Sequence, residues 1–142
     1  MPGRTKALTE YGMIDYTGAF PIETKVRDLD SRLYLGLRCI QHIPNFQIIL
    51  GGKSSLRRFL ERTPDIKIIY FSKGEMRSKL PIYESIKSKA GIIVCLDEEG
   101  GPSKKDISQF LLRYPNEICE LTDLVFAWGD VQKQILLKNR QE

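Results

Sequence analysis

The sequence predicts an α/β fold, a three-layer Rossmann-like domain in which helices flank a five-stranded, mostly parallel sheet. Five short apolar runs alternate with stretches in which apolar residues recur at helical spacing, as expected for βαβ units. The runs are continuous rather than alternating, which is typical of parallel strands covered by helices on both faces. Polar or glycine residues follow each run, at the edge where open α/β sheets bind ligands.

Each predicted strand is a run of aliphatic and aromatic residues bounded by turn-forming residues. The predicted strands span about 18–23, 46–50, 66–71, 92–96 and 124–127. The fourth run, at 92–96, is the strongest strand signal in the chain. Pro21 weakens the first run, since proline cannot donate a ladder hydrogen bond.

The first predicted helix starts near Asp28, a suitable N-cap residue. Its inward face is expected to carry Leu29, Leu33, Leu37 and Ile40, which recur at helical spacing. Further helices are predicted after Ser54 or Ser55, from Pro81 to Gly91, after Ser103, over 116–121, and from Asp130 to about Lys138.

Length and composition indicate one globular domain. The chain has 142 residues, which we divide into an extension at 1–17 and a Rossmann-like domain at 18–142. Its three cysteines are far apart and it has one histidine, so no zinc site of ordinary spacing is expected. The net charge of +4 is mild, and no basic stripe indicates a nucleic-acid partner. No apolar run reaches the roughly 18 residues of a membrane-spanning helix.

The densest charged segment, residues 23–32, crosses the end of the first predicted strand and the start of the helix after it. A helix N-terminus and cationic side chains together favour an anionic ligand, such as a phosphate or a sugar acid. The alternative is that Asp28 only caps the helix while Asp30 and Arg32 face water.

A second cluster, Asp97-Glu98-Glu99-Gly100-Gly101, follows the fourth predicted strand. Three adjacent carboxylates repel one another, and partial burial would raise the pKa of one of them, as a general base requires. A solvated acidic loop or a divalent cation site are the alternatives.

Trp128 follows the fifth predicted strand, where its ring either stacks on a sugar or packs over the sheet. Lys53, in Gly51-Gly52-Lys53-Ser54, superficially suggests a phosphate loop, but the segment lacks the full spacing of that motif.

Three segments together resemble the amino-terminal half of the surface carbohydrate (polysaccharide) biosynthesis proteins, which are similar to glycosyltransferases of the two-domain GT-B architecture. They are PIETKVRDLDSRL at 21–33, LDEEG at 96–100 and FAWGDVQ at 126–132. Their order and spacing fit across residues 20–137. The resemblance implies the acceptor-side domain of a sugar-transfer enzyme, incomplete as a catalyst alone. A second domain, which we expect to be absent from this chain, would hold most contacts to the nucleotide sugar.

The resemblance also implies roles for particular residues. The candidate catalytic base is Glu98 or Glu99, with Glu23 as the runner-up. The residues expected to bind substrate are Lys25, Arg27, Asp30, Arg32, Lys53, Lys73, Asp97, Gly100 and Trp128. We expect no metal and no cofactor, since helix dipoles and basic residues stabilise the leaving diphosphate in such enzymes.

The expected partners are a nucleotide sugar and a carbohydrate acceptor, shared with the second domain. We expect a cytoplasmic protein, with peripheral association at the inner face of the membrane left open, as is the oligomeric state. Two alternatives remain. One is a non-catalytic module that binds a sugar or phosphate without turnover. The other is a flavodoxin-like regulatory domain with Asp97 as phospho-acceptor, which would need a lysine after the fifth strand.

Overall fold

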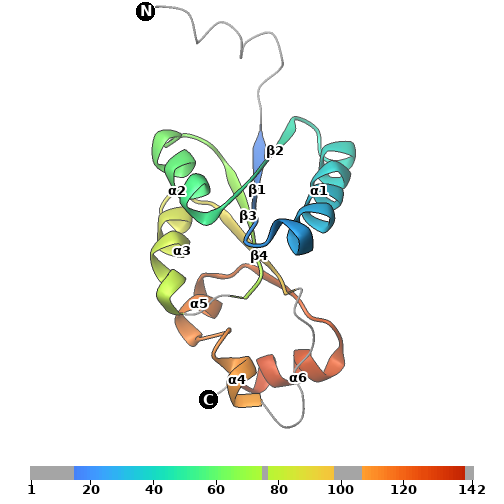
Figure 1. The fold of residues 1–142 in the computed structure, drawn as a ribbon. Coiled ribbons are helices and arrows are strands. Elements are labelled where there is room, and N and C mark those ends of the chain that lie inside the picture. The colour runs from blue at the N-terminus through green and yellow to red at the C-terminus, as the bar shows by residue number, and fades with distance from the viewer. Residues whose placement is uncertain (1–14, 75–76, 98–106, 140–142) are drawn as a thin grey trace, which may run out of the picture. The chain divides into compact units, whose positions relative to one another are not determined.

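The computed structural model describes residues 15–74, 77–97 and 107–139. It confirms the predicted fold class, with one five-stranded parallel sheet and helices on both of its sides (Figure 1). The strand order is β2-β1-β3-β4-β5, a doubly wound order. β2 is added on one side of β1, and β3, β4 and β5 are added in turn on the other side.

The observed elements follow the predicted alternation closely. The strands are β1 (Tyr16–Pro21), β2 (Phe46–Gly51), β3 (Ile68–Ser72), β4 (Ile92–Leu96) and β5 (Leu124–Phe126). The helices are α1 (Lys25–His42), α2 (Lys53–Arg62), the 3-10 turn η1 (Arg77–Lys79), α3 (Leu80–Lys87), α4 (Ile107–Leu111), α5 (Asn116–Leu121) and α6 (Asp130–Asn139). β1 begins at Tyr16 rather than Gly18, so the sheet includes the last residues of the predicted extension.

The chain divides into two compact units, Met1–Ile69 and Tyr70–Glu142, with the division inside β3. The sequence predicted a single domain from residue 18 onward. We call these parts unit 1 and unit 2 and describe each by itself.

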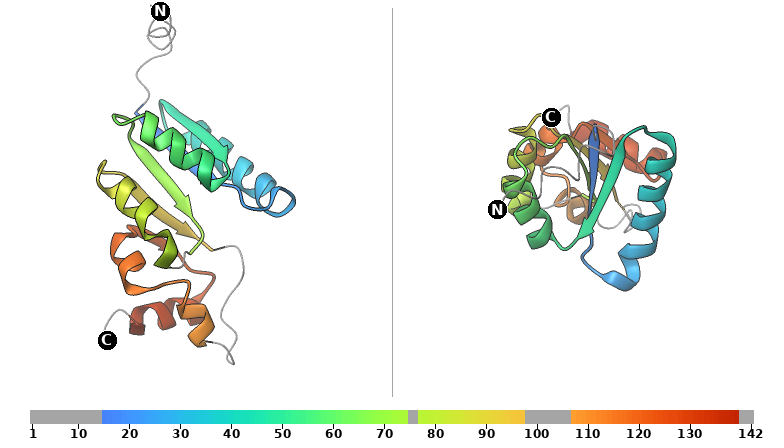
Figure 2. Two further views of the ribbon diagram at one scale, coloured as in Figure 1. Left: turned by 60° about the vertical axis from the view of Figure 1, so that its left-hand side comes forward. Right: turned by 90° about the horizontal axis from the view of Figure 1, so that it is seen from above.

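In unit 1, β1 and β2 pair in parallel from Tyr16 opposite Phe46 to Pro21 opposite Gly51. α1 and α2 lie on opposite sides of this pair, which is clear from the side and from above (Figure 2). β1 is buried along nearly its whole length, as a central parallel strand should be. Pro21 ends it, so its missing N–H does not interrupt the ladder.

The buried face of α1 differs from the predicted one. Leu33 and Leu37 are 39% and 48% exposed, while the residues that face the sheet are Asp28, Arg32 and Gly36. These three recur every four residues and therefore share one side of the helix. Gly36 permits a close approach to β2, because a Cβ there would lie 2.8 Å from the Ile48 Cδ1 atom.

In unit 2, β4 pairs in parallel with β5, and α3 packs against β4 and α5. Its core includes a cluster of Cys95, Phe110, Tyr114 and Cys119. α3 ends in a Schellman motif: the N–H of Gly91 donates to the carbonyl of Ile86, and the N–H of Ala90 donates to that of Lys87. Ala90, which directly precedes the predicted end of this helix at Gly91, takes the left-handed conformation, with φ of 54°.

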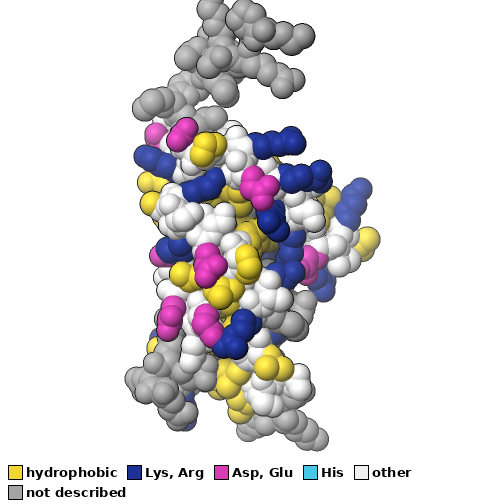
Figure 3. Space-filling model, turned by 90° about the vertical axis from the view of Figure 1, so that its left-hand side faces the viewer, with side chains coloured by type: hydrophobic (Ala, Val, Ile, Leu, Met, Phe, Trp, Pro, Cys, Tyr) yellow, Lys and Arg dark blue, Asp and Glu magenta, His cyan; other side chains and the backbone are white. Residues whose placement is uncertain are grey.

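Charged side chains of both signs are interspersed with hydrophobic ones on the face drawn in Figure 3. Arg57 and Glu61 of α2 form an ion pair one helical turn apart, with an Nε to Oε1 distance of 2.9 Å. Such exposed pairs contribute little to stability.

Candidate functional site

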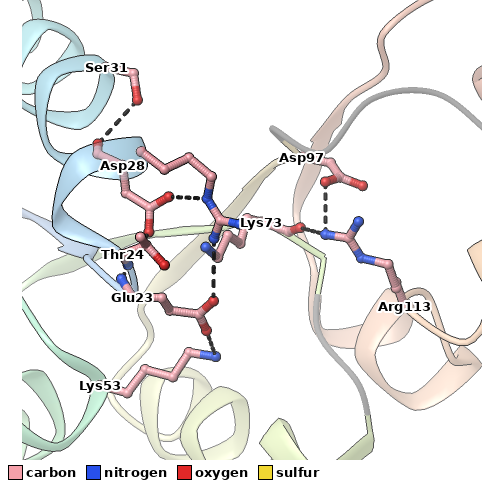
Figure 4. A network of polar contacts seen from close by, with 9 residues as sticks. Glu23, Thr24, Asp28, Ser31, Lys53, Lys73, Asp97 and Arg113 are labelled. Atoms are coloured by element: carbon pink, nitrogen blue, oxygen red, sulfur yellow. Dashed lines mark hydrogen bonds and ion pairs between the residues drawn. The ribbon is translucent and has the colours of Figure 1, made fainter.

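Unit 1 builds a polar network around the N-terminus of α1, and Asp28 is its centre (Figure 4). The Asp28 side chain is buried, and its Oδ2 atom accepts hydrogen bonds from the backbone N–H groups of Glu23 and Thr24, both at 2.9 Å. Its Oδ1 atom accepts a third from Arg27 Nε at 2.8 Å. The carboxylate thus caps the helix from inside its first turn, at the positive end of the helix dipole. The prediction that Asp28 precedes the helix as its N-cap residue is wrong, because the helix begins at Lys25.

Glu23 connects this network to α2. One of its carboxylate oxygens pairs with Lys53 Nζ, and the other lies 3.9 Å from Arg27 Nη2. The segments that follow β1 and β2 are therefore joined by an ion pair. The two cations favour the charged form of the Glu23 carboxylate and so make it a weaker base, which disfavours the catalytic role.

The remaining predicted residues of unit 1 separate into two groups. Lys25 and Asp30 are exposed on α1, where a ligand can reach them. Arg32 is only 1% exposed and lies on the sheet-facing side of the helix, below Asp28. The alternative that Arg32 faces water is therefore wrong, whereas its predicted role in binding an anionic ligand stays a prediction. Its position four residues after Asp28 places both side chains on the same buried face.

Unit 2 builds a second network around Asp97, directly after β4 (Figure 4). The Asp97 side chain is fully buried. Its Oδ1 atom accepts a hydrogen bond from Arg113 Nη2 at 2.9 Å, and its Oδ2 atom accepts one from the Tyr114 hydroxyl at 2.8 Å. A buried carboxylate with a cation and a neutral donor on its two oxygens is well satisfied.

The same network reaches the ends of β3 and β5. Arg113 Nη2 also donates to the carbonyl of Lys73, the buried residue that follows β3, at 3.1 Å. The indole Nε1 of Trp128, which follows β5, donates to the backbone carbonyl of Asp97. Polar contacts therefore link the carboxyl ends of three consecutive strands, which is where the sequence predicted a site.

The Trp128 ring is fixed but not covered. Trp128 is 61% exposed, so most of its surface is not covered by the sheet, and the stacking of its ring on a sugar stays a prediction. Its indole N–H is bonded to Asp97, and its backbone N–H donates to the Gln132 Oε1 atom. Gln132 is itself buried, and its Nε2 atom lies 3.4 Å from the Tyr114 hydroxyl. The ring is thus an oriented, accessible aromatic surface at a strand end.

Burial sets the electrostatics of unit 2. It raises the pKa of the Cys95 thiol to about 11, and the nearby Asp97 carboxylate adds to the rise. Burial also raises the pKa of the Tyr114 hydroxyl, with Cys95 and Asp97 adding to the effect. Tyr114 therefore stays protonated at neutral pH and acts as a donor to Asp97.

The predicted bases Glu98 and Glu99, and the predicted ligand contact Gly100, lie outside the described residues. Asp97, which precedes them, is described, and its position bears on the regulatory alternative. A phospho-acceptor carboxylate must meet its phosphoryl donor, whereas both oxygens of Asp97 are buried and bonded. This geometry argues against that alternative.

Sequence reasoning missed Arg113, Tyr114 and Gln132. Gln132 stands in the third quoted segment, but nothing in the pattern indicated its contacts. The only available signal for Arg113 was indirect, since a carboxylate buried after an apolar strand needs a donor or a cation.

Over residues 15–74, 77–97 and 107–139, no group of three or more His, Cys, Asp or Glu residues is arranged to hold a metal ion. Within the same residues, no helix has both the length and the apolarity needed to cross a membrane. Comparison of the sequence with protein-family models, curated proteins and solved structures found no match. The resemblance to the surface carbohydrate biosynthesis proteins therefore stays a prediction.

Proposed function

We propose that this chain is the acceptor-side domain of a GT-B-type sugar-transfer enzyme in surface polysaccharide biosynthesis, and that it holds a sugar ring against Trp128. The single observation that carries the proposal is that Trp128 is 61% exposed while its indole N–H is anchored to the backbone carbonyl of Asp97. An aromatic ring of this kind offers a flat apolar face to the C–H groups of a sugar.

The hydrogen-bond network that holds Trp128 supports the proposal. A side chain that is already held in place loses little conformational entropy when a ligand binds to it. Asp97 is held by Arg113 and Tyr114, and Trp128 is held by Asp97 and Gln132. These contacts come from the ends of β4 and β5, from the segment after α4 and from α6, so the ring is supported from several elements of unit 2.

In the proposed reaction, a donor-binding domain would bring the nucleotide sugar to this surface, and Glu98 or Glu99 would accept the proton of the acceptor hydroxyl. When transfer is assayed with that domain present, Glu98→Gln and Glu99→Gln should not both leave activity intact. Arg27 and Lys53 already pair with Asp28 and Glu23, so we place the sugar at Trp128 rather than at the unit 1 network.

The binding step can be tested on the chain as it is. Isothermal titration against hexoses, N-acetylhexosamines and hexuronic acids should find a ligand, and Trp128→Ala should weaken it at least about tenfold. Trp128→Phe keeps an aromatic face but loses the indole N–H, so its affinity should lie between those of the wild type and Trp128→Ala. Tyr34→Ala is the matched control, because Tyr34 is also an exposed aromatic residue, on α1 of unit 1. Equal affinity in the wild type and Trp128→Ala would contradict the proposal.

A further inference from the structure

A second feature of unit 2 lies apart from the residues predicted to bind substrate. A cavity of about 520 Å³ is formed by β5, the turn before it and α6, and none of the predicted site residues lines it. Its volume is within the range of about 300–1,000 Å³ that is usual for small-molecule sites.

The wall of the cavity is largely apolar and unusually accessible. Leu124 and Phe126 of β5 are 49% and 54% exposed, and Leu137 of α6 is 45% exposed. Leu124 and Phe126 alternate along the strand, so they point to the same face. Exposed hydrophobic side chains that are scattered singly need no explanation, whereas several of them around one cavity indicate a binding surface.

Three polar side chains in the wall are already hydrogen-bonded within the protein. The Tyr114 hydroxyl donates to Asp97, and the Thr122 hydroxyl donates to the Ile118 carbonyl at 2.7 Å. The Asp123 carboxylate accepts from Lys87 and from a backbone N–H, each at 2.8 Å. A polar ligand would therefore gain few new hydrogen bonds from these three side chains, whereas an apolar one would be removed from water.

Two charged side chains also line the cavity, and both are exposed to solvent. Asp130 and Lys133 lie in the first turns of α6, on the same side as the cavity. Their exposure places them at the mouth, where a polar group of a ligand can remain hydrated.

We propose that this cavity binds the hydrocarbon chain of an amphiphile, an acyl or prenyl chain, with its polar head at the mouth beside Asp130 and Lys133. The apolar wall, the internally satisfied polar groups and the charged mouth all match this one ligand class. The site goes beyond the sugar surface at Trp128 and does not depend on it.

The test uses the intact chain and the fluorescent apolar probe N-phenyl-1-naphthylamine. The probe should bind at one site per chain and be displaced by dodecanoate but not by butyrate, which has the same head and a short chain. Leu137→Arg, which places a charge in the wall, should weaken dodecanoate binding at least about tenfold. Val131→Arg is the matched control, because Val131 is on the same helix, is 63% exposed and does not line the cavity.

Gly129→Leu gives a second variant in case Leu137→Arg disturbs α6, as checked by circular dichroism. Gly129 lines the cavity, and no atom lies within 4 Å of where its Cβ would be, so a side chain can be added there without a clash at its Cβ. It should also weaken binding. The proposal is overturned if the probe does not bind, if butyrate competes as well as dodecanoate, or if the folded cavity variants bind like Val131→Arg.

Discussion

Arg113→Met tests whether the Asp97 network is the structural support of unit 2. The change removes the cation from a carboxylate whose side chain is fully buried, while the Tyr114 hydroxyl remains on the other oxygen. Removing one partner of a buried ion pair usually costs about 3–5 kcal/mol. Arg113 is 22% exposed and one donor persists, so we expect a loss of about 2–3 kcal/mol in the free energy of unfolding.

The assay is urea denaturation at pH 7 of a double-mutant cycle with Asp97→Asn. Because the double variant contains no unpaired buried charge, it should be more stable than the sum of the single losses predicts, with a coupling of about 1–3 kcal/mol. Arg77→Met is the matched control: Arg77 pairs with Glu117 at the surface, and its loss should cost less than about 1 kcal/mol. Additive losses within about 0.5 kcal/mol, or equal losses at both arginines, would refute the reasoning.

Three further predictions concern the core and the turns. Burial raises the pKa of the Cys95 thiol from its ordinary value of 9.0 to about 11, so the unfolded state loses its proton first. The free energy of unfolding should therefore fall by about 1 kcal/mol between pH 8 and pH 10, and Cys95→Ala should reduce this fall. Gly18→Ala should lower the stability by about 1–3 kcal/mol in thermal denaturation, because the added Cβ would lie 2.7 Å from the Phe46 ring. Gly51→Ala, measured in the same series, should lower it by less than about 0.5 kcal/mol, because the atom nearest to the added Cβ is 3.7 Å away. Ala90→Gly should stabilise the protein by about 1 kcal/mol, because Ala90 has a φ of 54° that glycine adopts without strain.

Each of these has a result that contradicts it. If the free energy of unfolding of Cys95→Ala falls with pH as steeply as that of the wild type, the thiol is not the titrating group. If Gly18→Ala and Gly51→Ala lower the melting temperature equally, the close approach of Phe46 to Gly18 does not determine the cost of the substitution. A lower melting temperature for Ala90→Gly would show that α3 does not end in the left-handed turn.

The fold was predictable because local patterns and burial agree. The run at 92–96 contains only apolar residues and is observed as β4 with the same bounds, and α5 also has its predicted bounds. Buried parallel strands leave a continuous apolar signal, and that signal does not depend on distant residues.

The buried face of α1 was not predictable in the same way. Its leucines give a regular apolar stripe, yet the sheet-facing side carries Asp28, Arg32 and Gly36. This side is favoured over the apolar one because hydrogen bonds satisfy the buried Asp28 and because a glycine permits close packing. Neither effect can be recognised from a hydrophobic pattern.

The candidate site was predictable only in part. Trp128 and Asp97 could be placed at strand ends, since the strand that precedes each is clear in the sequence. Their partners Arg113 and Tyr114 lie sixteen and seventeen residues beyond Asp97, and only tertiary packing brings them to its carboxylate.

The most direct test of the central claim uses the fluorescence of Trp128, the single tryptophan of the chain. Its emission reports on the proposed sugar surface without interference from other indoles. A saccharide that stacks on the ring should shift the emission to shorter wavelength saturably and protect it from quenching by acrylamide. If a saccharide binds by calorimetry while the emission and the quenching stay unchanged, or if no saccharide in the panel binds at all, the account of Trp128 as the sugar-binding surface is contradicted.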